Sequence, residues 1–243
     1  MPDGALRTIP MAALHDGRQF LINKFAISVT QGLNLVDPHP MEKKDTKILL
    51  AGLTESVQGF PALINVSSEL QAIQKFFKGT VLKNEDFLIS HIKKELEETP
   101  YSIVHIASHG EFKGEATQTY LLTWDGKLSM DQIEGFMKLT RFRQNPVELL
   151  TLSACQTAAG DDRAALGLAG VAMKAGARSA LATLWFINDR ASSELVEEFY
   201  RQLQQESISK AKALQMAQIK LLSSNRYQHP CYWSAFLMLG NWL

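Results

Sequence analysis

Two stretches of the chain place a reactive side chain directly after an apolar run that is typical of a buried strand. Cys155 follows the run at residues 147–152, and His109 follows a second run at residues 102–107. A thiol and an imidazole are the nucleophile and the general base of cysteine hydrolases, because the imidazole takes the thiol proton and later gives it to the leaving amine. Taken alone, Cys155 would be interpreted as a structural core cysteine, since free Cys is among the most buried residue types.

The order and spacing of the two residues favour catalysis. If the two runs are neighbouring strands of a parallel sheet, their carboxyl ends meet at one edge, where open α/β sheets bind their ligands. The histidine precedes the cysteine by 46 residues (155 − 109), which matches the caspase order and its spacing of about 50 residues. Gly110 lets the backbone approach a substrate closely, and the N–H groups of Gly110 and Cys155 could form an oxyanion hole.

The other histidines and the second cysteine fit different roles. His105 lies within a strand-like run, so we interpret it as a core histidine that has a hydrogen-bond partner. His105 and His109 are spaced like a zincin pair, but the spacer lacks the glutamate and the helix of such a site. His229 and Cys231 could be half of a metal site, yet no Cys-x-x-Cys completes it. We therefore expect no metal ion.

The elements that must position His109 and Cys155 are strands that alternate with helices. Apolar runs predict strands at residues 47–52, 80–82, 102–107, 147–154 and 179–185, and a closing strand within residues 229–240. A helical apolar period predicts helices at residues 63–77, 84–98, 163–175, 188–203 and 209–222. We also expect hairpins at residues 19–30 and around Asp125-Gly126, and a capping box from Ser129 to Gln132. This alternation predicts an α/β fold with a largely parallel sheet.

Composition places the chain among soluble globular proteins. Its 243 residues are 46% hydrophobic and 21% charged, and the formal net charge is zero. A protein that binds nucleic acid or an anionic membrane would have a basic excess, so we expect neither partner. The sequence has no apolar run of about 18 residues and no secretory signal pattern. Two cysteines do not make a disulfide framework, so the expected location is the reducing cytoplasm.

Several blocks of sequence carry a resemblance to a known family. His105-Ile-Ala-Ser-His109-Gly110 and Leu152-Ser-Ala-Cys155-Gln-Thr resemble the two motifs of the CHAT domain family, which are caspase-like cysteine peptidases related to separases. Residues 2–14, 172–178, 184–189, 199–200 and 229–233 resemble further family blocks. The resemblance implies one caspase-like domain over residues 1–243, a three-layer α/β/α sandwich with a mainly parallel central sheet of about six strands. It also implies that His109 is the general base and Cys155 the nucleophile.

The chain departs from the family pattern in two ways. Family members usually carry tetratricopeptide or other repeats before the peptidase domain, whereas this sequence has none and begins inside the usual N-terminal part. Thr157 stands two residues after the cysteine, where the caspase signature has glycine. We expect a repeat-containing regulatory protein to order the polar loop at residues 111–118, and weak activity without such a partner.

The predicted function is limited proteolysis by a cysteine endopeptidase with a Cys155–His109 dyad, a protein or peptide substrate and no cofactor. One alternative is a catalytically silent module that keeps the fold and docks a partner; the presence of both dyad residues favours the enzyme. The other is a Rossmann-like nucleotide-binding domain. The absence of a Gly-x-Gly-x-x-Gly fingerprint and of a P-loop in the sequence argues against it.

Three aspartates are candidates for the acidic wall of a substrate pocket. Asp189 comes just after a predicted strand that should lie near the cysteine strand. By resemblance to separases, an acidic residue here would pair with an arginine or lysine before the scissile bond, which is a charge-assisted contact. Asp161 and Asp162, close after Cys155, are competing candidates. The structural alternative is that Asn188 or Asp189 is the N-cap of the next helix.

Overall fold

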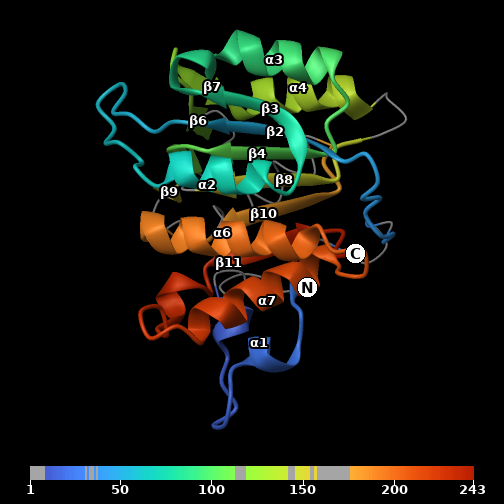
Figure 1. Cartoon of the computed structure of the whole chain (residues 1–243), viewed down its shortest axis with the longest axis vertical. Coiled ribbons are helices and arrows are strands. Elements are labelled where there is room, and N and C mark those ends of the chain that lie inside the picture. Colours follow the sequence, from blue (N-terminus) through green and yellow to red (C-terminus); the bar gives the residue numbers. More distant parts are fainter. Residues whose placement is uncertain are drawn as a thin grey trace.

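The chain is built on a central sheet whose strands are mostly parallel (Figure 1). The computed structural model describes residues 9–30, 32, 36, 38–112, 119–141, 146–153, 156–157, 176–185 and 187–243. Within these residues seven strands pair in the order β1-β11-β10-β8-β4-β2-β3. Their bounds are Ser28–Val29 (β1), Lys47–Gly52 (β2), Lys78–Lys83 (β3), Ile103–Ala107 (β4), Leu149–Ser153 (β8), Ser179–Thr183 (β10) and Phe236–Gly240 (β11). Only β11 and its neighbour β1 run against the others.

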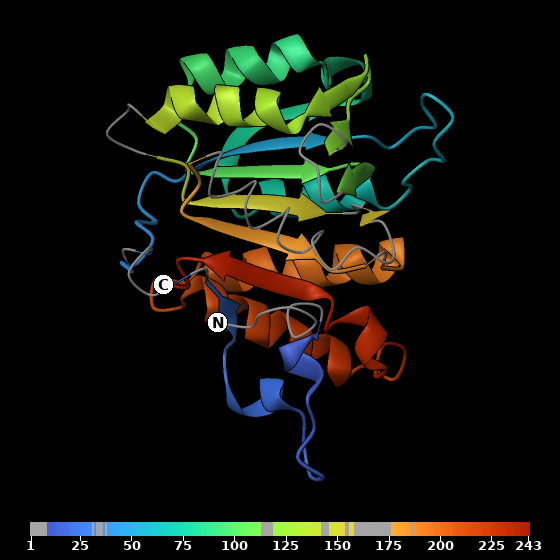
Figure 2. The same cartoon turned by 180° about the vertical axis from the view of Figure 1, so that it is seen from behind.

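Helices cover both faces of this sheet, which confirms the predicted three-layer α/β/α sandwich. Alternate residues of β2 enter two separate cores, because successive strand side chains point to opposite faces. Ile48 and Leu50 pack with residues of α2 (Val66–Gln74), α6 (Asp189–Leu203) and α7 (Lys210–Leu222). Leu49 and Ala51 pack with residues of α3 (Ile89–Glu98) and α4 (Met130–Arg141). Seen from behind in Figure 2, the strands lie in front of α2, α6 and α7.

A second, smaller sheet extends the carboxyl edge of the first. Its order is β7-β6-β5-β9, with bounds Lys127–Ser129, Tyr120–Leu122, Gly110–Phe112 and Gln156–Thr157. Strands β6 and β7 are the predicted hairpin around Asp125-Gly126. The capping box is also confirmed, because Ser129 N–H donates to Gln132 Oε1 (2.9 Å) and Gln132 N–H donates to Ser129 Oγ (3.3 Å).

The hairpin predicted at residues 19–30 is wrong. Residues Leu21–Lys24 form a helical turn, α1, in which Asn23 Oδ1 accepts from the Phe20 N–H and Leu21 O accepts from the Phe25 N–H. The following residues, Ser28–Val29, pair with β11 instead of folding back on their neighbours. This strand brings the central sheet to seven strands where about six were expected. The predicted helix at residues 163–175 lies outside the described residues.

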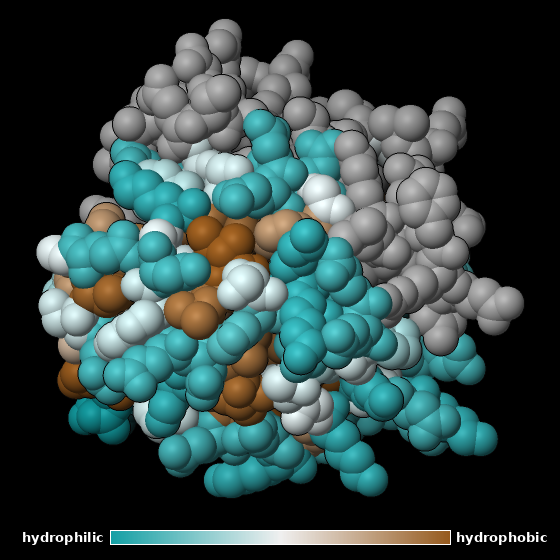
Figure 3. Space-filling view, turned by 90° about the horizontal axis from the view of Figure 1, so that it is seen from above, coloured by the Kyte–Doolittle hydropathy of each residue, from teal (hydrophilic) through white to brown (hydrophobic). Residues whose placement is uncertain are grey.

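The remaining short elements and the outer surface agree with a globular sandwich. In the part of the chain that the structure describes, 3₁₀ turns lie at Met11–Ala13, Asn84–Asp86 and Pro230–Tyr232. Lys93, Lys94, Glu97 and Glu98 form an exposed charged face of α3, whereas Glu95 is partly buried and accepts a hydrogen bond from the Tyr101 hydroxyl. Viewed from above in Figure 3, hydrophilic side chains cover most of the described surface, with apolar residues in the gaps between them. In the described part of the chain, no helix has the length and apolar character needed to cross a membrane.

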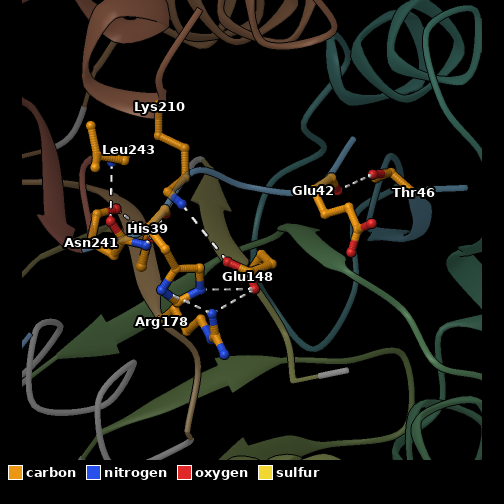
Figure 4. Close-up of polar contacts among 9 residues, drawn as sticks. His39, Glu42, Thr46, Glu148, Arg178, Lys210, Asn241 and Leu243 are labelled. Carbon is orange, nitrogen blue, oxygen red and sulfur yellow. Dashed lines mark hydrogen bonds and ion pairs between the residues drawn. The ribbon is translucent and has the colours of Figure 1, made fainter. Parts of the chain in front are cut away.

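A partly buried ionic cluster lies at the amino edge of the sheet (Figure 4). Lys210, at the start of α7, is fully buried, and its Nζ lies 3.9 Å from Glu148 Oε2. Arg178 Nη1 lies 3.3 Å from the other oxygen of Glu148, and His39 Nε2 lies 3.9 Å from that same oxygen. Burial lowers the pKa of Lys210 to about 8; Glu148 opposes this shift, while Arg178 and Lys43 add to it. The charged form of this lysine is therefore disfavoured in the folded protein.

We expect the free energy of unfolding to rise between pH 8 and about pH 10.5, because the unfolded chain then holds the Lys210 proton that the folded chain has released. Below pH 8 the full penalty for a buried ammonium is present, roughly 3 kcal/mol for a shift of this size. Lys210→Met should remove this pH dependence and leave the protein as stable or more stable at pH 7, since Glu148 keeps Arg178. Urea unfolding at several pH values measures both effects. Lys212→Met, at an exposed position of α7, is the control, and an equal rise with pH in the Lys210→Met chain would contradict the assignment.

Candidate active site

His109 stands where the central sheet passes into the smaller sheet. The backbone N–H of Ser108, the residue before it, still donates to Ser153 of β8 (3.2 Å), as the last rung of the parallel pairing. The carbonyl of His109 accepts from the Leu122 N–H of β6 (2.8 Å), and the Ser108 hydroxyl donates to the Leu122 carbonyl (2.6 Å). His109 is only 6% exposed. The backbone around His109 is therefore held by both sheets.

The imidazole of His109 has one nitrogen fixed by a backbone carbonyl. Nε2 lies 2.8 Å from the carbonyl oxygen of Pro61, and the Phe60 ring lies tilted against the imidazole with 5.1 Å between ring centroids. A carbonyl oxygen only accepts hydrogen bonds, so Nε2 carries a proton and, in the neutral ring, Nδ1 is the basic nitrogen. Nothing in the sequence indicates a role for Pro61, because a backbone carbonyl leaves no residue-type signal.

The chain on both sides of Cys155 is paired with the chain on both sides of His109. Before the two residues, Ala107 of β4 pairs with Ser153 of β8, and after them Glu111 of β5 pairs with Gln156 of β9. Three residues, 108–110, connect the pairs on the histidine side, and two residues, 154–155, connect them on the cysteine side. Cys155 itself lies outside the described residues, as do Asp161 and Asp162.

Gly110 lies in β5, between the neighbouring strands β6 and β9 of the smaller sheet. It faces Leu121 in the antiparallel pairing of β5 with β6. Because the neighbouring bond runs from the Leu122 N–H to the His109 carbonyl, Gly110 and Leu121 are a non-hydrogen-bonded pair. The Gly110 N–H is therefore directed away from β6, toward the side on which β9 pairs with β5.

Asp189 does not cap helix α6. Asn188 is the N-cap, and its side chain accepts from the Ala191 N–H at 3.2 Å. The carboxylate of Asp189 instead contacts Asn65: Oδ2 accepts from the backbone N–H at 3.0 Å and from the side-chain Nδ2 at 2.6 Å. The prediction that residues 188–203 form a capped helix is confirmed, and Asn188 is the residue that caps it. The part of Asp189 in substrate binding stays a prediction.

His105 is a core histidine, as predicted. Its Nε2 lies 2.9 Å from Glu69 Oε1 of α2, and its Nδ1 lies 3.3 Å from the hydroxyl of Tyr200 of α6. That hydroxyl donates to Thr151 Oγ1 at 2.8 Å. All four side chains are buried. Burial raises the pKa of Tyr200 above its usual range, an effect that Thr151 opposes and the Glu69 charge reinforces. The network lies on the α2 and α6 face of the sheet, below the edge that carries His109.

The described residues include no group of three or more His, Cys, Asp or Glu side chains arranged to hold a metal ion. The predicted absence of a metal remains a prediction, because several acidic residues and Cys155 lie outside those residues.

Comparisons with known proteins agree with this architecture. The fold is similar to the Arg-specific cysteine proteinase gingipain R (RgpB), with a TM-score of 0.56 and 9% identity over 82% of this chain and 48% of that chain. The complex of the Porphyromonas gingivalis RgpB pro- and mature domains gives a TM-score of 0.52 at 10% identity, with the same coverage of 82% and 48%. Caspase-1 from Spodoptera frugiperda gives 0.51 at 13% identity over 82% of this chain and 88% of that one.

These likenesses show a caspase-like fold, and the chain spans about half the length of the gingipain chains that it matches. Comparison with curated proteins gives no match. The model of the CHAT domain matches residues 1–241, nearly the whole sequence. The chain therefore belongs to the CHAT domain family.

Proposed function

We propose that the chain is a cysteine endopeptidase in which Cys155 is the nucleophile and His109 the general base. The observation that carries the proposal is the double pairing of the flanking chain, Ala107 with Ser153 and Glu111 with Gln156. Neighbouring strands lie about 4.8 Å apart. Pairing both before and after the two residues therefore supports a single site that holds the thiol and the imidazole around one substrate bond.

The contacts of His109 define its part in the proposed reaction. Nδ1 takes the thiol proton, and the thiolate sulfur attacks the carbonyl carbon of the scissile peptide bond. The N–H groups of Gly110 and Cys155 stabilise the charge on the carbonyl oxygen. Nδ1 then gives its proton to the leaving nitrogen as the C–N bond breaks, and a water molecule hydrolyses the thioester. The Pro61 carbonyl stabilises the imidazolium between these steps, because the bond from Nε2–H becomes charge-assisted.

A catalytically silent interaction module is the competing function. Such a module would keep the sandwich, the small sheet and the contact between His109 and Pro61, because these also hold the fold together. It would not need an activated thiol. The two functions therefore differ in the chemistry of Cys155, which can be measured without knowing the natural substrate.

We expect limiting iodoacetamide at about pH 6 to alkylate Cys155 in preference to Cys231. A neighbouring imidazolium favours the thiolate, which is the reactive species, so Cys155 should react where an ordinary thiol does not. Cys231 is exposed, so accessibility alone would favour labelling there. Peptide mapping by mass spectrometry gives the ratio of the two labels. His109→Gln should remove the preference, and a label found mainly on Cys231 of the unchanged chain would count against the peptidase.

The proposal includes a preference for a basic residue before the scissile bond. The contacts of Asp189 with Asn65 engage Oδ2, so a substrate guanidinium or ammonium would pair with Oδ1. Asp161 and Asp162 compete for this role, since they follow Cys155 closely in the chain. An ion-paired hydrogen bond contributes about 1.5–3 kcal/mol, which corresponds to a preference of about 10- to 100-fold.

We expect Asp189→Asn to lower kcat/KM for Arg and Lys peptides about 10- to 100-fold relative to a Met peptide. The variant keeps an acceptor for Asn65 and removes only the charge, so the free energy of unfolding should fall by no more than about 1 kcal/mol, the size of a helix-dipole contribution. A double Asp161→Asn/Asp162→Asn variant is the matched comparison. If that double variant alone loses the basic preference, the acidic wall lies there and Asp189 has no part in it.

Regulation by a repeat-containing partner remains part of the proposal. The loop on which it rests, residues 113–118, lies outside the described residues, whereas Glu111 and Phe112 at its start belong to β5. A partner that orders this loop would act directly beside the proposed oxyanion hole at Gly110.

A further inference from the structure

The segment that carries Pro61 is fastened to the rest of the molecule at both of its ends. At one end a tight turn places Gln58 (φ 51°) and Gly59 (φ 83°) in the left-handed region, and the Gln58 side-chain amide donates to the carbonyls of Thr123 (3.0 Å) and Trp124 (3.2 Å). At the other end the Asp189 carboxylate holds Asn65. Pro61, whose carbonyl fixes the His109 ring, lies between these two anchors.

The contact between Asn65 and Asp189 overrides a local preference. Asn65 occupies the N-cap position of α2, where asparagine usually accepts a bond from its own helix. Its side chain makes no such bond and donates to Asp189 instead. Asp189 does not cap a helix either, because Asn188 is the N-cap of α6. Neither side chain therefore caps its own helix. Instead, the two residues contact each other across 124 positions of sequence.

The charge of Asp189 suits this position. The carboxylate lies in the first turn of α6 and accepts from the backbone N–H that precedes α2, so it faces the positive ends of two helix dipoles. A bond from a neutral amide to a carboxylate is also stronger than one between two neutral groups. The pair is therefore a firm link between the α6 terminus and the segment at residues 61–65.

We infer that Asp189 and Asn65 form a positioning clamp that, by holding the segment at residues 61–65, sets the place of the Pro61 carbonyl and so the tautomer and orientation of His109. The inference rests on the proposed function, since it assigns Asp189 to the histidine side of that site. Asp189 and Asn65 are positioning residues, because they act on His109 through Pro61. If Asp189 also lines a substrate pocket, its two oxygens serve the two roles separately.

The first arm of the test is kinetic and uses the full chain with peptides that carry Arg, Lys, Met or Asp before the scissile bond. Asn65→Ala removes one bond of the clamp without changing any charge, and it should lower kcat about tenfold on every peptide that is cleaved, with KM within about twofold. Asp189→Ala removes both bonds and should lower kcat about 100-fold. Asp131→Ala, which removes a carboxylate from the first turn of α4, is the control and should leave kcat unchanged.

The second arm needs no activity. In a Cys155→Ala background, ¹⁵N NMR of the His109 ring should show a single neutral tautomer protonated at Nε2, and Asn65→Ala should produce a mixture of both tautomers. A kcat within twofold of the parent and an unchanged tautomer in the Asn65→Ala chain would overturn the clamp. If the parent chain cleaves none of the peptides, the proposed peptidase fails while the NMR result still decides the clamp. If Asp189→Ala does not fold, the kcat and the tautomer of the Asn65→Ala chain still test the clamp.

Discussion

Cys155→Ala and His109→Gln should each reduce peptide turnover by about 10⁴-fold or more, and the double variant should be no worse than either single one. Nucleophile and base act as one unit, so once one is removed the other contributes little. Glutamine is the sharper replacement for His109, because its side-chain amide can still donate to the Pro61 carbonyl but cannot take a proton from a thiol. The fold should therefore survive while the chemistry is lost.

Turnover of a fluorogenic peptide panel and a urea unfolding curve measure the two sides of this prediction. Cys231→Ala is the matched control, since it removes the other thiol, which is exposed. We expect the Cys231→Ala chain to keep full activity. Turnover that persists in Cys155→Ala would show that another group performs the reaction or that the activity comes from a contaminating protein. Loss of turnover in Cys231→Ala would contradict the assignment of Cys155 as the only thiol that the reaction needs.

The parts of the fold that the sequence predicts are those with long, uninterrupted patterns. The runs at residues 47–52 and 102–107 became β2 and β4, because a strand buried on both faces is apolar throughout. Helices α6 and α7 begin at the positions predicted for their starts, where Asn188 and Ser209 are the N-caps. The strand ends adjacent to His109 and Cys155 followed from parallel pairing, which the observed β4–β8 register confirms.

The elements that the sequence did not predict are short or depend on distant partners. Strand β1 has two residues, and its partner Met238 is 210 positions away from Ser28, so local alternation suggested a hairpin instead. Strands β5 and β9 have only three and two residues and are defined only by what they pair with.

Contact partners of the site residues were missed for a related reason. Pro61 takes part through a backbone oxygen, and Asn65 contributes through a contact that local helix-capping preference argues against. The sequence correctly identified His105 as a core histidine from its place inside a strand-like run, but nothing in it identified Glu69 as the buried neighbour of His105. Contacts of this kind follow from the packing of helices on a sheet and not from residue patterns along one segment.

The contact between His105 and Glu69 supports a second prediction with a large expected effect, on stability. We expect His105→Leu to lower the free energy of unfolding by about 3–5 kcal/mol, because it leaves the Glu69 carboxylate buried without its partner. Glu69→Leu should cost about 1–3 kcal/mol, since it removes the carboxylate that lies 2.9 Å from the buried Nε2 of His105. The double variant should recover most of the loss, because two apolar side chains of similar volume pack in this core without a desolvation penalty.

Urea unfolding of the two single variants and the double variant gives the coupling energy of the pair directly. Losses of unfolding free energy that simply add in the double variant would contradict the buried pair, because additivity requires that the two side chains do not interact.

The same proteins also separate stability from catalysis. His105 lies on the α2 and α6 face with Tyr200 and Thr151, and the proposed chemistry takes place at the edge beyond β4. Each folded variant should therefore keep the kcat of the parent chain at a temperature well below its unfolding transition, and a selective loss of kcat with unchanged stability would place His105 in the reaction instead of the core.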